Sequence, residues 1–375
     1  MALTLAGAAG EVAGRFGFTG TVQVARFGSG LINESYRVVG AGPDGMGSYL
    51  LQRLNPQVFP DGDAVMANIR AVTAHLGRAV ARDSQVDHRR VVLELIPFAN
   101  GALAFLAPDG ARWRLFRFIE GTVTLDRVTE PPEAFEVARA FGRFHALLAD
   151  YDGPLLATTI HGFHDTPARL AALELSIERD AAGRVGSVRD EIEFVRARAP
   201  MVEWLERAAR EGRVPRRIAH HDAKASNVLI DAVTGEGLAV VDLDTVMPGL
   251  LLYDVGDLIR SVTCSTAEDA PDPAAVTLRR DLFAALAEGF FAGLGPVRLA
   301  PAEYELFVAS GLVITFEQGI RFLTDFLDGD PYYRTVRPGQ NLDRARVQLA
   351  LVRALEEGRG ELEAIVRGIV GQGRP

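Results

Sequence analysis

The stretch that decides the fold is RIAHHDAKASNVLID (217–231), which LAVVDLDTVMPG (238–249) follows closely. Each stretch contains a short apolar run of β type, and the residues between them include Gly235. Two such runs around a glycine-containing turn predict a β-hairpin. The polar residues that flank the runs are then expected to meet at one end of that hairpin.

The predicted hairpin gathers oxygen-bearing side chains. A turn centred near Gly235 places Asn227 roughly opposite Asp244. Because side chains alternate along a strand, Asp242 and Asp244 are expected on one face. Asp222 lies in the loop immediately before the first strand. Three carboxylates and an amide are therefore expected in one small volume.

This concentration of carboxylates predicts a metal-dependent reaction. Clustered carboxylates repel one another unless a cation lies between them. Mg²⁺ usually takes one or two carboxylates and completes its shell with phosphate oxygens and water. A carboxylate that stays off the metal can accept a proton from an attacking hydroxyl. These are the parts that phosphoryl transfer from ATP requires.

The composition argues against several classes of protein. The 375-residue chain has a formal net charge of -9 and a pI ≈ 5.4, unlike a nucleic-acid binder with a basic face. Its single cysteine, Cys264, excludes an intramolecular disulfide and a cysteine-based zinc site. The N-terminal residues lack the basic start of a signal peptide, and no apolar run is long enough to span a membrane. We expect a cytoplasmic protein, monomeric or homodimeric, without a membrane partner.

The pattern along the chain predicts an α+β fold with two lobes. The first third alternates β-type runs with turns around one helical pattern at 62–80. We expect a small N-terminal lobe (1–121) with an antiparallel sheet, one main helix and a hinge at its end. A larger, mostly helical C-terminal lobe (122–375) would carry the catalytic loop and the acceptor site. The expected strands lie at 21–27, 34–39, 48–54, 91–96 and 112–119.

The spacing of the polar residues resembles the catalytic signature of kinases. His220-x-Asp222 is followed five residues later by Asn227 and fifteen residues after that by Asp242, as in H-x-D-x-x-x-x-N with a later metal-binding aspartate. The surrounding sequence resembles the aminoglycoside phosphotransferase and choline kinase superfamily, most closely its N-acetylhexosamine 1-kinase group. The resemblance implies a bilobal, protein-kinase-like fold. It runs through HHDAKASNVL, VVDLDTVMPG, LYDVGDLIR, GSGLINESY, YLLQRLNPQVF, FIEGTVTLD, FHDTPARL, RFLTDFLDGDPYY and NLDRARVQL.

The resemblance implies a role for each residue of the signature. Asp222 would be the catalytic base, and Asn227 and Asp242 would hold Mg²⁺ with ATP as the phosphate donor. His220 would support the catalytic loop. Lys224 stands two residues after the aspartate, where protein kinases place a lysine that contacts the transferred phosphate.

The nucleotide side is predicted from the segment between the first two strands. Kinase-like folds keep a Gly-rich loop over the phosphates there, and Gly28 and Gly30 would allow a close backbone approach. Asn33 and Glu34 follow, where they could reach a phosphate or the acceptor sugar. A plain hairpin turn is the alternative for this segment.

Two further nucleotide contacts follow from the resemblance. Arg53 on the third strand offers a cation where a kinase has the lysine that pairs with the phosphates. Asn68 stands near the place of that lysine's usual glutamate partner, but it is neutral. The backbone of Ile119 and its neighbours would read the adenine edge in a hinge, unless this segment is an ordinary strand end.

The acceptor side is predicted from Asp244 and Arg321. Arg321 lies beside the apolar stripe of a helical pattern at 301–327, and a buried arginine must be paired. Its partner would be an acceptor oxygen or a cleft carboxylate, or else Glu317 or Asp325 one turn away. The resemblance implies that Arg321 binds sugar. For Asp244 the alternative is an exposed aspartate at a strand end.

The acceptor itself stays open at this point. The anomeric hydroxyl of an N-acetylhexosamine is the first candidate, and an aminoglycoside, a choline-like amino alcohol or homoserine is the alternative. A third hypothesis is a nucleotide-binding protein without transferase activity. The complete set of Asp222, Asn227 and Asp242 argues against it, because a binding module has no use for the base.

Overall fold

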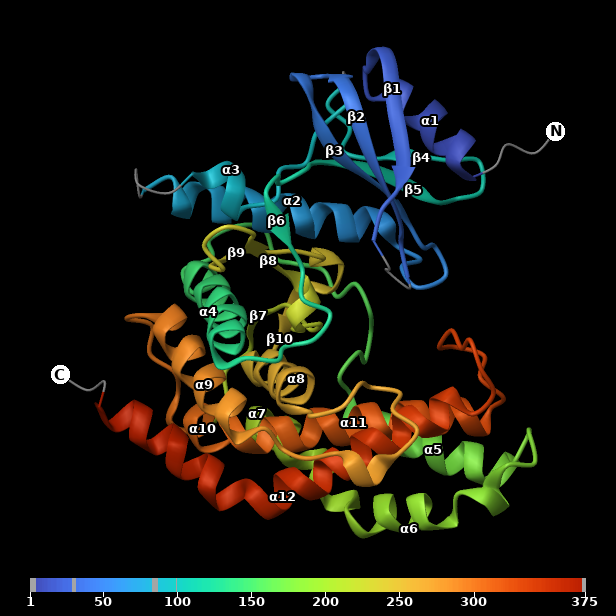
Figure 1. Cartoon of the computed structure of the whole chain (residues 1–375), viewed down its shortest axis with the longest axis vertical. Coiled ribbons are helices and arrows are strands. Elements are labelled where there is room, and N and C mark those ends of the chain that lie inside the picture. The colour runs from blue at the N-terminus through green and yellow to red at the C-terminus, as the bar shows by residue number, and fades with distance from the viewer. Residues whose placement is uncertain (1–4, 29–31, 83–86, 99, 373–375) are drawn as a thin grey trace.

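The chain folds into two lobes, with an antiparallel β-sheet in one and mostly helices in the other (Figure 1). A computed structural model describes residues 5–28, 32–82, 87–98 and 100–372. The predicted α+β class with its two unequal parts is confirmed. In this described part, no helix is both long and apolar enough to cross a membrane.

The N-terminal lobe is built on a sheet of order β1-β2-β3-β5-β4, in which neighbouring strands are antiparallel. Side chains alternate between its two faces. Leu51 and Leu115 pack on the face covered by the first helix, whereas Leu54 and Phe116 pack against the second. The elements are α1 (Leu5–Arg15), β1 (Thr19–Arg26), β2 (Glu34–Gly42), β3 (Gly45–Leu54), α2 (Gly62–Val80), α3 (His88–Val91), β4 (Phe105–Leu106) and β5 (Arg112–Arg117).

Residues 91–96 do not form the strand that their apolar run predicts. The segment begins in the short helix α3, and Leu95 makes only an isolated bridge with Phe116 of β5. Strand β4, far shorter, takes the edge position of the sheet. The run is partly buried against α2, so its apolar character is explained by packing and not by a strand ladder.

Helix α2 is fastened to the C-terminal lobe by Asn68, which is 3% exposed. Its Nδ2 donates to the carbonyls of Ala157 (2.8 Å) and Val246 (3.0 Å), and its Oδ1 accepts from the Ala157 N–H (2.9 Å). Asn68 is therefore fully engaged between the lobes, and it does not serve as a partner for Arg53.

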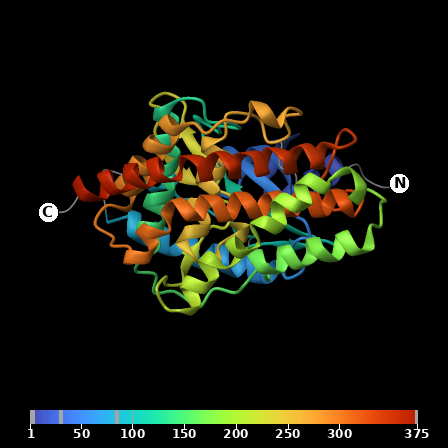
Figure 2. The ribbon, with the colours of Figure 1, turned by 90° about the horizontal axis from the view of Figure 1, so that it is seen from below.

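The C-terminal lobe is a helical assembly in which α11 and α12 run side by side (Figure 2). One large apolar core joins nearly all of its helices. The helices are α4 (Pro131–Leu148), α5 (Thr166–Arg179), α6 (Arg189–Ala197), α7 (Trp204–Arg210), α8 (Leu251–Thr263), α9 (Arg280–Leu294), α10 (Pro301–Glu305), α11 (Phe307–Leu327) and α12 (Gln340–Gln372), with shorter 3-10 turns η1 (Val185–Ser187), η2 (Ala199–Glu203), η3 (Ala225–Asn227), η4 (Leu243–Thr245) and η5 (Pro273–Ala275).

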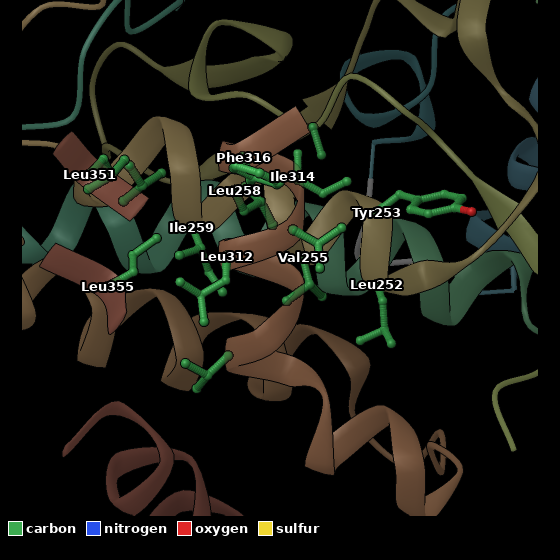
Figure 3. Close-up of a cluster of buried hydrophobic side chains, with 14 of the residues drawn as sticks. Leu252, Tyr253, Val255, Leu258, Ile259, Leu312, Ile314, Phe316, Leu351 and Leu355 are labelled. Atoms are coloured by element: carbon green, nitrogen blue, oxygen red, sulfur yellow. The ribbon is translucent and has the colours of Figure 1, made fainter. Parts of the chain in front are cut away.

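Helix α8 lies at the centre of this core, against α11 (Figure 3). Leu258 and Ile259 pack in the same cluster as Leu312. Gly256 permits the close approach of the two helices, because a Cβ there would lie 2.5 Å from the carbonyl oxygen of Ser310. This packing fixes the position of α8, which supplies several charged residues to the site described below.

Short strands inside the helical lobe carry the predicted hairpin. Strands β8 and β9 pair antiparallel, so the hairpin predicted from the sequence is confirmed. Its register differs from the prediction, because Val228 lies opposite Val240 and Asn227 therefore lies beside Val241 and not opposite Asp244. The strands are β6 (Thr122–Val123), β7 (Arg217–Ala219), β8 (Val228–Asp231), β9 (Gly237–Val240) and β10 (Met247–Gly249).

Candidate active site

The loop between β7 and β8 is held by Asp254 of α8, whose side chain is fully buried. Its two carboxylate oxygens accept the backbone N–H groups of His220 and His221, both at 2.7 Å, and the Nε2 of His145 lies 2.9 Å away. Burial opposes ionisation, but His145 and the neighbouring histidines lower the pKa of Asp254 to about 2. Asp254 therefore stays ionised and fixes the backbone just before Asp222.

His220 braces the same loop from inside. Its ring packs edge-on against Phe141 and Phe144. The Nε2–H donates to the carbonyl of Val241 (2.9 Å), and Nδ1 accepts from the Asp222 N–H (3.3 Å). These contacts join the start of the loop to the end of β9.

Asp222 is surrounded by donors. Its Oδ2 accepts from Lys224 Nζ (2.7 Å) and from Asn227 Nδ2 (2.9 Å), which leaves Oδ1 without a donor among the described residues. Burial raises the pKa of Asp222, but the Lys224 ammonium outweighs that effect and the pKa is lowered overall. In turn Asp222 and Asp242 hold the pKa of Lys224 above its ordinary value against burial. Near neutral pH the pair is therefore a carboxylate and an ammonium.

Asp242 lies where the chain turns away from β9. The strand ends at Val240, and Asp242 adopts a left-handed conformation (φ 60°) just before η4. Desolvation in the cleft, followed by the like charges of Asp244 and Asp222, raises the pKa of Asp242 to about 6. The expectation that Asp242 and Asp244 share one face of a strand is wrong, because the strand has already ended.

The residues at this end of the hairpin fit a hard cation. Asn227 Nδ2 is engaged by the backbone oxygen (2.8 Å) and the carboxylate of Asp222, so its amide oxygen is the atom available to a metal. The Val241 N–H donates to the Asn227 carbonyl (2.9 Å), which brings Asp242 beside Asn227. No group of three or more His, Cys, Asp or Glu suited to a metal occurs in the part of the chain described. Mg²⁺ needs no such group, because phosphate and water complete its shell.

Asp244 points into the boundary between the lobes and not toward an acceptor. It is 2% exposed, forms an ion pair with Arg114 of β5, and accepts from Asn33 Nδ2 (2.6 Å). Asn33 Oδ1 accepts from the Asn55 N–H (3.0 Å). The geometry argues against the acceptor-binding role predicted for Asp244, since both of its oxygens are taken by the N-terminal lobe. The burial of Asp244 also excludes the alternative of an exposed aspartate at a strand end. Asn33 is engaged as well, through both the nitrogen and the oxygen of its side-chain amide.

Arg53 and Glu34 lie on the face of the sheet that is turned away from the cleft. Arg53 pairs with Asp109 in the turn before β5 (2.7 Å), and Glu34 stands opposite Arg53 in the β2–β3 register. Burial, followed by the nearby charge of Glu34, raises the pKa of Tyr36 on the same face. The structure therefore argues against the predicted phosphate and acceptor contacts of Arg53 and Glu34. Side chains alternate along β3, and the residue that faces the cleft is Gln52, one position before Arg53. The prediction therefore chose the wrong one of two neighbouring residues.

Arg114 is the cation that the sequence reasoning missed. It is 1% exposed, and its Nε and Nη2 donate to Gln52 Oε1 (3.1 and 2.9 Å) across the β3–β5 pair. Alternation within RWRLFR puts Arg112 and Arg114 on one face, and this signal was available. The choice of the cleft-facing side, however, depends on packing against α2.

The remaining predicted nucleotide contacts are Gly28, Gly30 and Ile119, and the structure describes the backbone at two of them. Gly28 follows β1 in a left-handed conformation (φ 76°) that suits a tight turn. Gly30 lies outside the described residues. Ile119 is buried directly after β5, in the segment that leads to β6, and its carbonyl accepts from Thr122 Oγ1 (2.8 Å).

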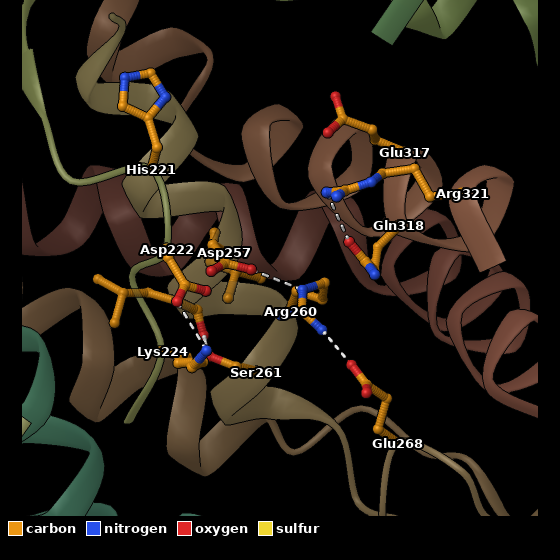
Figure 4. Close-up of polar contacts among 12 residues, drawn as sticks. His221, Asp222, Lys224, Asp257, Arg260, Ser261, Glu268, Glu317, Gln318 and Arg321 are labelled. Atoms are coloured by element: carbon orange, nitrogen blue, oxygen red, sulfur yellow. Dashed lines mark hydrogen bonds and ion pairs between the residues drawn. The ribbon is translucent and has the colours of Figure 1, made fainter. Parts of the chain in front are cut away.

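Helices α8 and α11 form the other half of the site. Figure 4 shows Asp257 and Arg260 of α8 near Asp222, with Arg321 of α11 beyond Arg260. Arg260 Nε pairs with Asp257 (2.7 Å), and its Nη1 pairs with Glu268 (3.1 Å). The sequence did not identify these three residues, because the tertiary fold alone brings α8 and the 264–279 loop to Asp222.

Arg321 lies among aromatic rings. Its guanidinium carbon is 5.4 Å from the ring centroid of Phe163 and 5.7 Å from that of Tyr333, and its Nη1 donates to Gln318 Oε1 (3.3 Å). Such positions favour a cation by its attraction to the ring faces.

The carboxylates that could have neutralised Arg321 have other partners. Glu317 accepts from His164 Nδ1 (2.9 Å) and Thr166 Oγ1 (2.6 Å), and Asp325 accepts the N–H groups of Tyr332 and Tyr333. Within the described ranges, Arg321 has no carboxylate within ion-pair distance. The alternative of a pair with Glu317 or Asp325 is therefore wrong.

A two-lobed fold with a carboxylate, an amide and a second carboxylate at the cleft defines a kinase-like phosphotransferase. The chain belongs to the phosphotransferase enzyme family (APH), whose profile matches residues 23–304. It is therefore an enzyme that phosphorylates a hydroxyl acceptor, and the predicted superfamily is confirmed.

Solved structures of related fold support the same architecture. A microcompartment-associated aminopropanol kinase has a TM-score of 0.63 at 14% identity, covering 95% of this chain and 98% of its own. The spectinomycin phosphotransferase APH(9)-Ia, in complex with ADP and spectinomycin, has a TM-score of 0.57 at 12% identity, with 93% and 98% covered. Choline kinase from Cryptosporidium parvum Iowa II has a TM-score of 0.54 at 14% identity, with 93% and 91% covered. At these identities the likeness establishes the fold alone.

Proposed function

We propose that the protein is an ATP-dependent kinase that transfers the γ-phosphate to a hydroxyl of an oxygen-rich, uncharged acceptor. The anomeric hydroxyl of an N-acetylhexosamine is the first candidate, as the resemblance implies. We assign the nucleotide to the lobe formed by residues 1–121 and the acceptor to the lobe formed by residues 122–375.

We assign the proton transfer to Asp222. Its Oδ2 is held by Lys224 and Asn227, so Oδ1 is the oxygen available to accept the hydroxyl proton of the acceptor. A lowered pKa keeps it ionised at neutral pH. His220 and Lys224 act on this loop, His220 through the backbone and Lys224 through its ammonium beside the reacting oxygen.

We assign Mg²⁺ to Asn227 and Asp242. When bound, the metal neutralises charge on the phosphates during transfer. The raised pKa of Asp242 supports this assignment, because repulsion by Asp222 and Asp244 is what a cation would relieve. Asp242 supplies the carboxylate and Asn227 the amide oxygen.

The observation that carries the choice of acceptor is the state of Arg321. It brings a positive charge without a direct ion pair among the described residues to the acceptor half of the site, whereas the nearby acids are paired, Asp257 with Arg260 and Glu317 with His164. An ammonium group on the acceptor would be repelled by Arg321, and the nearby carboxylates of Asp257 and Glu317 already have partners. Hydroxyl and carbonyl oxygens would instead accept its N–H groups.

A second candidate is a cationic acceptor such as an amino alcohol or an aminoglycoside. The names of the structural neighbours favour it, since they include aminopropanol, spectinomycin and choline kinases. The rings of Phe163 and Tyr333 are of the kind that bind ammonium groups. Here, however, Arg321 already lies against both rings.

An acceptor panel tests the proposal directly. ADP release with ATP and Mg²⁺ would be measured for N-acetylhexosamines, choline, aminopropanol, spectinomycin and homoserine. We expect the highest kcat/KM with an N-acetylhexosamine, and NMR of the product would locate the phosphate on the anomeric oxygen. Turnover restricted to the ammonium-bearing acceptors would overturn the proposal in favour of the second candidate.

A further inference from the structure

We propose that Arg114 and Asp244 are positioning residues that set the nucleotide site of the N-terminal lobe against the metal-binding turn. With Gln52 and Asn33 they form a chain of contacts that we call the inter-lobe strut. The inference rests on the proposed use of ATP and goes beyond it, because neither residue needs to touch the acceptor.

The strut is polar throughout, and its central ion pair is buried, whereas Gln52 and Asn33 are partly buried. The Arg114–Asp244 pair has side chains only 2% and 3% exposed, and Gln52 orients the guanidinium by accepting from its Nε and Nη2. Gln52 in turn donates to Ser35 Oγ on β2 (3.0 Å). Strands β2, β3 and β5 therefore all take part in positioning one carboxylate of the other lobe.

That carboxylate is rigidly connected to the proposed chemistry. Asp244 lies in the η4 turn, two residues after Asp242. The next residue, Thr245, donates through Oγ1 to the His220 carbonyl (2.7 Å), and Thr159 Oγ1 donates to the carbonyl of Asp244 itself (3.1 Å). Because this turn is tied to the catalytic loop, the strut sets the position of the N-terminal sheet relative to both Asp242 and that loop.

The strut is not needed merely to hold the lobes together. Helix α2 already joins them through Asn68, and through His75, whose ring contacts the Leu147 carbonyl (3.0 Å). A buried ion pair is also a poor means of stabilisation, because the loss of hydration offsets most of the attraction. Its directional bonds do, however, fix the distance between two surfaces.

The strut also places a buried cation on the cleft side of the sheet. On the third strand the cleft-facing residue is Gln52, not a lysine, and the positive charge comes from the neighbouring strand as Arg114. Its carboxylate partner comes from the metal-binding turn and not from α2, where Asn68 is neutral. The two halves of the pair thus lie on the two lobes.

The test compares three variants: Arg114→Gln, Asp244→Asn, and the double variant that combines these two substitutions. The single variant Arg112→Gln is the matched control. Arg112 lies on the same strand and the same face, but its partner Asp63 belongs to the N-terminal lobe (2.7 Å). Binding of ATP with Mg²⁺, and of a non-hydrolysable ATP analogue, would be measured by calorimetry. Melting temperature and the separate KM values for ATP and acceptor would be recorded on the same samples.

We expect Arg114→Gln to weaken nucleotide binding at least about tenfold, because the sheet is then no longer held against the metal-binding turn, with the acceptor KM changed less than twofold. Arg112→Gln should leave nucleotide binding unchanged. The double variant leaves no unpaired buried charge, so its melting temperature should return toward that of the wild type while nucleotide binding stays weak. If Arg114→Gln does not fold, the double variant decides.

Two results would overturn the strut. One is wild-type nucleotide affinity in Arg114→Gln, and the other is a double variant that regains both stability and nucleotide affinity. A wild-type protein that does not bind ATP with Mg²⁺ would instead overturn the proposed donor, and the inference with it.

Discussion

Asp242 and Asp244 stand two residues apart and have opposite surroundings. Asp242 lies in a left-handed turn at the cleft, where desolvation and then the neighbouring carboxylates raise its pKa to about 6. Asp244 is buried between the lobes and has Arg114 and Asn33 on its two oxygens. The carboxylate of Asp242 therefore has no partner among the described residues at the surface of the cleft, whereas the carboxylate of Asp244 is paired within the interface between the lobes. The η4 turn separates the two residues.

The comparison teaches that substitutions at Asp242 and Asp244 should have different effects, one on activity and the other on stability. Removing Asp242 deletes a charge that its neighbours repel, so stability should hardly suffer while activity is lost. Removing the charge of Asp244 leaves Arg114 buried without its counter-ion, which is destabilising. The following predictions test that division of roles and extend it to the residues around the pair.

The largest effect is expected at the third carboxylate of the cluster. Asp222→Asn should lower kcat by about 10²- to 10⁴-fold, because a general base contributes that much. Binding of ATP should persist, since the base acts on the acceptor. Rapid-quench kinetics and calorimetry would check the two statements, and a variant that keeps more than about a tenth of wild-type kcat would contradict the assignment.

Asp244→Asn should be the most destabilising of the aspartate variants. Loss of one partner from a buried ion pair is expected to lower the free energy of unfolding by about 3 kcal/mol. Urea titration at neutral pH would measure it, with Asp242→Asn as the matched control, for which a change below about 1 kcal/mol is expected. Equal destabilisation by the two variants would remove the distinction drawn here.

Asp242→Ala should abolish metal-dependent turnover with little loss of stability. A metal ion contributes several kcal/mol to stabilising the transition state, so we expect a fall in kcat/KM of about 10²-fold or more. EDTA should stop the wild-type reaction, and Mg²⁺ or Mn²⁺ should restore it, whereas Zn²⁺ should not replace them in an all-oxygen site. Full activity in excess EDTA would end the metal assignment.

Arg321→Ala should act on the acceptor alone. Loss of a charge-assisted bond predicts at least about a tenfold rise in acceptor KM, or roughly 1.4 kcal/mol, with ATP binding and melting temperature nearly unchanged. Arg198→Ala is the control, because Arg198 also lies over an aromatic ring, Phe194, but pairs with Glu356 between α6 and α12. A lower melting temperature with normal acceptor KM would make Arg321 a structural residue.

The sequence predicted the features that depend on local spacing. It missed the features that depend on which face of a strand meets the other lobe. The hairpin around Gly235 and the convergence of Asp222 with Asn227 follow from short-range spacing, and both are present. Arg53 was assigned to the cleft by resemblance to the lysine on the third strand of kinases, and alternation alone does not say which face of that strand meets the other lobe. That choice is made by packing against α2, which also selects Arg114.

The α8 residues were missed for a related reason. Asp257 and Arg260 lie far from Asp222 in the sequence, on a helix whose position is set by the close approach at Gly256 to α11. The stretch LYDVGDLIR carries the family resemblance, but its local pattern gives neither Asp257 nor Arg260 a place beside Asp222. The same limit applies to Asp244, whose burial depends on a partner 130 residues away on β5.

The smallest effect is expected at Arg53, and it sharpens the contrast with Arg114. Both arginines lie on neighbouring strands and pair with an aspartate, but Arg53 meets Asp109, which is 55% exposed. Exposed pairs contribute about 0 to 1 kcal/mol, so Arg53→Gln should change the free energy of unfolding by less than about 1 kcal/mol. Because its side chain is on the far face of the sheet, affinity for ATP with Mg²⁺ should stay within twofold of the wild type, as calorimetry would show. A tenfold loss of nucleotide affinity in Arg53→Gln, with none in Arg114→Gln, would return the phosphate contact to Arg53 and show that the sheet turns its other face to the nucleotide.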